Sequence, residues 1–124
     1  MDHISIPVTD PTATRDFYAA CLTPLGWRLR GFQPDRYVGF HKPGAPVLYF
    51  NRAAHTAPVH LAFTATDPAA VRAFHDRALA AGGADNGAPG PRPDYGPRYF
   101  AAFVLDPDGH NVEAVLGGVR DAAP

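Results

Sequence analysis

His3-Ile4-Ser5-Ile6 recurs 57 positions later as His60-Leu61-Ala62-Phe63. In both stretches apolar residues alternate with polar or small ones, which predicts a β-strand with one buried face. The same offset aligns further residues without a gap: Asp10-Pro11 with Asp67-Pro68, Ala13 with Ala70, Arg15 with Arg72, Phe17 with Phe74, Leu22 with Leu79 and Gly26 with Gly83. Matches of this number at one offset indicate an internal duplication.

Each copy predicts a strand, a helix and three more strands. Asp10 and Asp67 are N-caps followed by proline, and the helices should run through about Leu22 and Ala81. Their packing stripes are predicted to contain Phe17, Leu22, Val71, Phe74 and Leu79. The later strands are expected near 27–32, 36–41, 46–51, 84–87, 98–105 and 110–116. Asp106-Pro107-Asp108-Gly109 predicts the last turn, and the glycine- and proline-rich stretch 87–97 predicts a loop.

We therefore expect an α+β fold of two tandem βαβββ modules, which form a curved, cleft-lining mixed sheet with helices on the outside. The whole chain, 1–124, is predicted to be one domain, with module one at about 1–52 and module two at about 58–117.

Composition limits the partners and the compartment. The net charge is −1 and no basic run occurs, which argues against a nucleic-acid partner. No apolar run approaches the roughly 20 residues of a membrane span. Cys21 is the only cysteine and is expected to be a small packing residue, and no signal peptide is visible, so we expect a cytoplasmic protein with a small-molecule partner.

Strand alternation predicts that the candidate metal ligands lie on the strand faces that point away from the helices. His3 and Ser5, and in the second copy His60, should lie on the faces opposite the helices. The small residues that follow each histidine there leave space for a ligand, although a tight sheet-on-sheet contact would also favour small side chains. Glu113 is the only glutamate and lies inside an apolar strand. A buried carboxylate without a partner would cost several kcal/mol, and a metal held with His3 and His60 would supply one. Two imidazoles and a carboxylate suit Fe(II) or catalytic Zn.

Other residues are candidates for binding the substrate. Aligning Gly109 with Gly44 places Leu48 at the position of Glu113 and Phe50 at that of Val115, and Phe50 and Val115 are expected to line the pocket. Arg92, Tyr95, Arg98 and Tyr99 are candidates to hold an anionic or aromatic substrate, the alternative being an ordered, proline-stiffened loop with solvated arginines. Residues expected at the surface or in turns are His41, His55, His75 and His110.

The motifs as a set resemble the vicinal oxygen chelate superfamily, which includes glyoxalase I, extradiol dioxygenases, fosfomycin-modifying enzymes and bleomycin-binding proteins. The matching pieces are Asp2–Ile6, Phe17-Tyr18, Leu25–Trp27, Val59–Phe63 and Phe103–Ala114. The resemblance implies a divalent metal ion (Fe, Zn, Ni or Mn) held by His3, His60 and Glu113, with Glu113 catalytic. Where glyoxalase I-like members offer a fourth ligand, the alignment gives Leu48 or its neighbour Val47.

The resemblance also implies a function. It points to a metal-dependent enzyme, a lyase or a dioxygenase, that chelates its substrate through vicinal oxygens. The alternative is a metal-free protein that binds and sequesters an antibiotic or a metabolite. Because relatives commonly pair modules across subunits, we expect a homodimer. Depending on how the modules pair, His3 of one site would come from the same subunit as His60 and Glu113 or from the second subunit.

Overall fold

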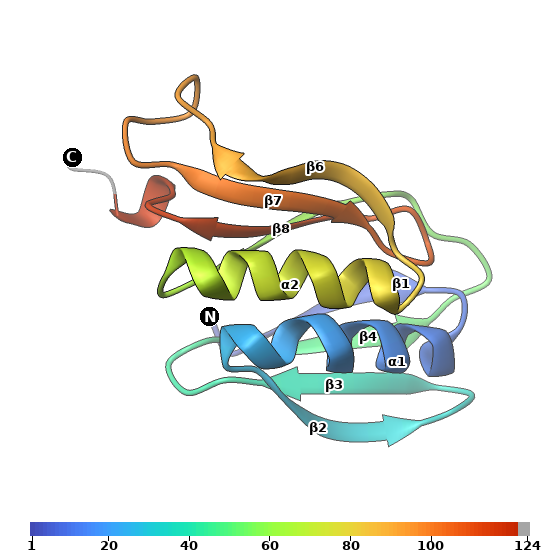
Figure 1. The fold of residues 1–124 in the computed structure, drawn as a ribbon. Coiled ribbons are helices and arrows are strands. Elements are labelled where there is room, and N and C mark those ends of the chain that lie inside the picture. Colours follow the sequence, from blue (N-terminus) through green and yellow to red (C-terminus); the bar gives the residue numbers. More distant parts are fainter. Residues whose placement is uncertain (122–124) are drawn as a thin grey trace.

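The computed structural model describes residues 1–121, in which both copies fold as βαβββ modules (Figure 1). The first contains β1 (His3–Val8), α1 (Pro11–Leu22), the 3-10 turn η1 (Thr23–Leu25), β2 (Arg28–Gln33), β3 (Tyr37–His41) and β4 (Val47–Arg52). The second contains β5 (His60–Thr64), α2 (Pro68–Ala80), β6 (Ala84–Pro91), β7 (Phe100–Leu105), β8 (Asn111–Leu116) and the 3-10 turn η2 (Val119–Asp121). The predicted α+β class and the tandem modules are confirmed.

Each module forms its own four-stranded sheet, in the order β1-β4-β3-β2 and β5-β8-β7-β6. The first strand of each module pairs in parallel with the last, and the remaining pairs are antiparallel. β1 and β5 are therefore edge strands, and these two strands carry the repeated histidines His3 and His60.

The helices begin where the sequence predicts. The Asp10 carboxylate accepts hydrogen bonds from the backbone N–H groups of Thr12 and Ala13, and Asp67 accepts one from Ala70. These bonds satisfy donors that a helix start leaves free, and the following proline has no N–H to satisfy.

The two modules share one apolar core. In Figure 1, α1 and α2 lie side by side, with β6–β8 along one flank of the pair and β2–β3 along the other. Phe17 and Tyr18 of α1 are fully buried, and the Tyr18 ring stacks on Phe50 at a centroid distance of 4.3 Å. Leu79 does not belong to the packing stripe as predicted: it is 38% exposed, and its neighbour Ala78 is buried in its place.

Strand β6 is longer than predicted and takes up the first part of the expected loop. It continues to Pro91 because irregularities in its pairing with β7, at Asp85/Gly87 and Gly87/Gly90, absorb the glycines. Gly87 has φ +153°, and an added Cβ would lie 2.9 Å from the Phe103 ring. The Arg92 side chain then closes the end of the strand by donating to the carbonyl oxygens of Ala88 and Gly90.

The predicted turn after β7 is a buried junction between the modules. The Asp106 carboxylate is 5% exposed and accepts hydrogen bonds from the backbone N–H groups of Asp108 and His110. Its other oxygen accepts from the Tyr18 hydroxyl of α1 at 2.7 Å. Burial, together with the charge of Asp106, raises the pKa of Tyr18 well above its ordinary value, so the phenol stays a donor.

His110 and His75 are buried, which corrects their predicted surface or turn positions. His110 Nδ1 accepts from the Val59 N–H at 3.0 Å, so its Nε2 carries the proton that faces the Pro7 carbonyl at 3.2 Å. His75 of α2 contacts the Asp85 carboxylate at 3.0 Å. His110 thus links Val59 to Pro7 through hydrogen bonds, and His75 links α2 to β6.

No helix within residues 1–121 is long and apolar enough to cross a membrane.

Cys21 is fully buried in α1, as expected of a packing residue, and burial raises the pKa of its thiol well above the ordinary value. Because the thiolate is the reactive form, we expect a disulfide reagent such as Ellman's reagent not to label the native protein at pH 8. Labelling should appear only along the urea unfolding curve measured by circular dichroism. Rapid labelling in buffer, close to the rate of free glutathione, would contradict this.

Gly117, directly after β8, has no room for a side chain. Its φ is +67°, and an added Cβ would lie 2.2 Å from the Arg98 carbonyl oxygen. We expect Gly117→Ala to lower the free energy of unfolding by about 3 kcal/mol, since it combines a left-handed backbone with a backbone clash. Gly44→Ala is the matched control, because Gly44 has φ +80° and nothing within 4 Å. It should cost only about 1 kcal/mol in urea denaturation. Equal losses in the two variants would refute the clash.

Candidate functional site

A histidine, a glutamate and a tyrosine meet on the face of the second sheet that is turned away from α2. His60 Nε2 lies 2.8 Å from Glu113 Oε1, and the Tyr99 hydroxyl donates a short hydrogen bond to Glu113 Oε2. The Glu113 side chain is 1% exposed, whereas that of His60 is 52% exposed. The Glu113 carboxylate is therefore buried, but its hydrogen-bond partner, the His60 imidazole, is accessible to solvent.

Strand register explains why these residues meet. β5 and β8 pair in parallel, with Ala62 opposite Glu113, so His60, two residues earlier, shares their face. Phe103 of β7 lies opposite Glu113 on the other side, and its ring centroid is 6.2 Å from that of His60. Tyr99 is the residue before β7 and reaches the carboxylate from there.

The hydrogen-bond geometry indicates which atoms of this cluster carry a proton. Burial, and next the hydrogen bond to Glu113, raise the pKa of Tyr99 well above its ordinary value, so Tyr99 stays a donor. An ionised carboxylate only accepts hydrogen bonds, so His60 Nε2 carries a proton when it faces Glu113. Binding a metal at this nitrogen would require that proton to leave.

His3 is not part of this cluster within one chain. It belongs to β1, where its Nδ1 lies 2.6 Å from Asp2 Oδ1 and its ring meets Tyr49 edge to face at 5.9 Å. Within residues 1–121, no three His, Cys, Asp or Glu side chains are grouped so that they could hold a metal ion. One chain therefore brings together two of the three predicted ligands, His60 and Glu113.

The residue of the first module that corresponds to Glu113 is Tyr49, not Leu48. Ser5 pairs with Tyr49 as Ala62 pairs with Glu113, and Ser5 and Ala62 are themselves 57 positions apart. The alignment through the glycines was one residue off because Gly44 and Gly109 occupy different positions in their turns. Each face thus holds a repeated histidine beside this position, with a phenol in one module and a carboxylate in the other.

The structure spreads the predicted substrate residues of β1, β4 and β8 over different environments. Ser5 is exposed on the face of β1 that also carries His3. Phe50 lies on the helix side of β4, fully buried against Tyr18, so it lines the core rather than a cavity. Val115 shares the face of Glu113 but is 7% exposed, since Gly118 folds against it.

The predicted loop residues also differ in what they can bind. The Arg92 guanidinium is occupied by the carbonyl oxygens of Ala88 and Gly90. Tyr95 is 64% exposed and packs against the Tyr99 ring at 5.3 Å. Tyr99 contacts Glu113 directly, a partnership that the sequence did not predict, because the loop places no constraint on which strand residue its tyrosine meets.

Among the cavities formed by residues 1–121, one borders the cluster. It measures about 470 Å³ and is lined by His60 and its neighbours in β5 together with parts of the first module. A second cavity, of about 660 Å³, lies between Tyr95 and the segment that leads into η2.

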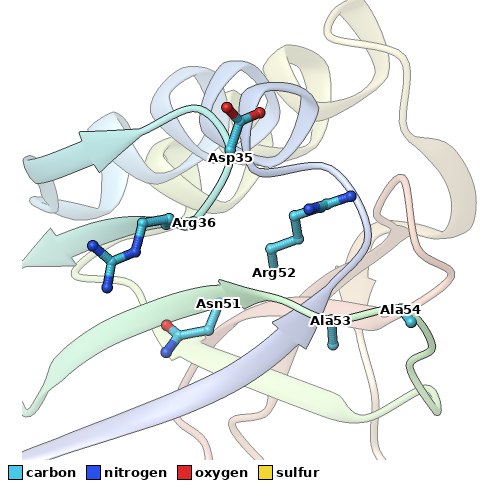
Figure 2. A pocket seen from close by; sticks show the side chains of 6 residues that line it. All are labelled: Asp35, Arg36, Asn51, Arg52, Ala53 and Ala54. Atoms are coloured by element: carbon cyan, nitrogen blue, oxygen red, sulfur yellow. The ribbon is translucent and has the colours of Figure 1, made fainter.

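The third cavity, of about 380 Å³, lies at the β2–β3 turn and is lined by Arg36 and Arg52 (Figure 2). Figure 2 shows these two side chains extending in opposite directions, so they do not converge on a common ligand atom. This cavity is therefore not a two-arginine anion site.

The family-model comparison identifies the class of protein. Residues 1–114 match the model of the Glyoxalase/Bleomycin resistance protein/Dioxygenase superfamily, and the chain belongs to this superfamily. No curated protein matches the sequence.

Solved structures agree in fold. A glyoxalase/bleomycin resistance protein from Albidiferax ferrireducens is 26% identical, with a TM-score of 0.78 over 93% of this chain and 96% of that one. A glyoxalase-related enzyme from Fulvimarina pelagi is 24% identical, with a TM-score of 0.73 over 93% and 86% of the two chains. A family enzyme from Burkholderia phytofirmans is 21% identical, with a TM-score of 0.73 over 93% and 98%.

Proposed function

We propose that this chain is a metal-dependent small-molecule enzyme whose site is completed in a homodimer. His60 and Glu113 of one copy, together with His3 of the other, would hold a divalent metal ion. The observation that supports this most directly is the 2.8 Å approach of His60 Nε2 to Glu113 Oε1, which brings an imidazole and a carboxylate to one point.

The donor set fits a metal only if a second copy contributes. Catalytic Zn and Fe(II) sites in the relevant classes take three protein ligands, and one chain offers two at this point. His3 occupies the position in β1 that His60 occupies in β5, and its side chain is 55% exposed. An exposed histidine on an edge strand is suited to complete a site on another copy.

The residues of the chain would then have distinct tasks. A bound divalent ion would act as a Lewis acid on two adjacent oxygens of the substrate. Tyr99 would hold Glu113 Oε2 in place, and that oxygen would be the group that accepts a proton from the bound substrate. Phe103, next to His60, would shield this side of the site from water.

A mixed dimer tests the arrangement. Co-expressing a His3→Ala chain with a Glu113→Gln chain, each with a different affinity tag, gives a heterodimer with one intact site if the ligands come from two subunits. We expect about one metal ion per heterodimer and almost none in either parent homodimer, measured by elemental analysis after dialysis with Zn²⁺ or Mn²⁺. If His3 served its own chain, the heterodimer would bind none.

The proposal also requires association. β1 and β5 each have one edge without a strand partner within residues 1–121, and twofold pairing is the usual way to cover such edges. We expect light scattering at micromolar concentration to give twice the chain mass. A monomer under these conditions would contradict the shared site and leave the fold untouched.

A second candidate function is metal-free binding of a small molecule. It is favoured by one observation: both oxygens of Glu113 already have partners, His60 and Tyr99, so burial of this carboxylate does not require a metal. A protein that binds no divalent ion as a dimer would be assigned to this second class.

A further inference from the structure

The cavity beside His60 is a groove between the two edge strands. It measures about 470 Å³ and is bounded by β5, by Ile4 of β1 and by the β3–β4 turn. Figure 1 places that turn, the end of β5 and η2 at the same end of the molecule. The volume lies within the range of small-molecule sites.

The floor of the groove is apolar and partly open to solvent. It consists of Ile4, Trp27, Leu48, Leu61 and Phe63. Ile4 is 39% exposed, and Trp27 meets the Phe63 ring edge to face at 5.5 Å. An exposed apolar floor of this kind gains free energy when an apolar group covers it.

The rim of the groove carries positive charge. Among the residues that the structure describes, Lys42 and Arg120 line it, and no aspartate or glutamate does. Neither cation forms an ion pair with an acid in residues 1–121. The chain as a whole has a net charge of −1, so this local excess of cations is not a property of the general surface.

We propose that this groove binds an amphipathic organic anion, with the apolar body on the Trp27–Phe63 floor and the anionic end between Lys42 and Arg120. Because His60 borders both the groove and Glu113, such a molecule would lie next to the proposed catalytic site. The claim that such an anion is the substrate rests on the proposed function, whereas the claim that the groove binds it does not.

Trp27 is the only tryptophan, so its fluorescence reports on the groove without a label. The probe is octanoate, titrated into the full chain in the presence of EDTA so that no metal takes part. We expect a saturable change in Trp27 emission, and binding at least about tenfold tighter than that of 1-octanol or octylammonium. Added salt should weaken it.

Two variants test the cationic rim. Lys42→Gln and Arg120→Gln should each weaken octanoate binding several-fold, whereas Arg77→Gln, which removes the same charge from α2 outside the groove, should not. Circular dichroism checks folding, and Arg120 in the exposed η2 provides the test if Lys42→Gln fails to fold. If octanoate did not change the Trp27 emission, as expected when a second copy fills the groove, the proposal would be overturned. It would also be overturned if 1-octanol bound as tightly as octanoate, or if the folded Lys42→Gln and Arg120→Gln variants bound octanoate as tightly as the wild type.

The outcome is separable from that of the metal proposal. Octanoate binding without any metal uptake would keep the groove as a binding site and refute the metal-dependent enzyme. Metal uptake by a dimer whose Trp27 does not respond to octanoate would keep the metal-dependent enzyme and refute the groove as a binding site.

Discussion

Glu113→Gln is expected to lower the affinity for divalent metal by on the order of 100-fold or more while leaving the chain folded. Glutamine has nearly the same shape as glutamate and can still accept the Tyr99 hydrogen bond, but it lacks the charge that a divalent ion requires of this ligand. Isothermal titration with Zn²⁺ or Mn²⁺ measures the loss, and thermal unfolding without metal checks the fold.

Two control variants separate ligation from other effects. Tyr99→Phe removes only the group that orients the carboxylate, and should cost about tenfold in metal affinity, as outer-shell changes do. Asp94→Asn removes a carboxylate from the exposed loop after β6 and should change nothing. If Glu113→Gln bound metal as tightly as the wild type, Glu113 would not be a ligand and the proposed His3–His60–Glu113 site would be refuted.

Asp106→Ala is expected to lower the free energy of unfolding by about 4 kcal/mol, the largest stability loss among the substitutions considered. The substitution leaves three buried or half-buried donors without their acceptor: the Tyr18 hydroxyl and the N–H groups of Asp108 and His110. These donors belong to α1 and to the β7–β8 turn, so the loss also weakens the contact between the two modules. Urea denaturation gives the value.

Tyr18→Phe is the matched control for Asp106. It removes one donor, keeps the ring that stacks on Phe50, and leaves the other two bonds of Asp106 intact. A loss of about 1–2 kcal/mol is expected. If the two substitutions cost the same, the backbone bonds of Asp106 would contribute nothing, and the junction would depend on the phenol alone.

Local features of the sequence were sufficient to predict the repeated βαβββ module. The alternation around His3 and His60 and the Asp-Pro helix starts act over a few residues, through side-chain period and capping. The turn that begins at Asp106 is equally local. These interactions need no tertiary partner to be recognised, and each of them is found where it was predicted.

Glycine positions alone could not determine the register of the last strand in each module. Gly44 and Gly109 both adopt positive φ in their turns, yet pairing with β1 and β5 makes Tyr49, not Leu48, the counterpart of Glu113. A shift of one residue moves a side chain to the opposite face of a sheet. Only the hydrogen-bonded neighbours of a strand determine which of two adjacent residues faces the site.

The sequence by itself determined the duplication, the two capped helices and the ligand-type residues on the first strands, because periodicity and capping are local. Tertiary structure alone decided that Glu113 meets His60 and Tyr99, that His110 is buried between modules, and that His3 lies apart from them in one chain. These outcomes depend on how two separately formed sheets pack around a shared pair of helices. That packing sums many weak apolar contacts between distant residues, and no short stretch of sequence encodes it.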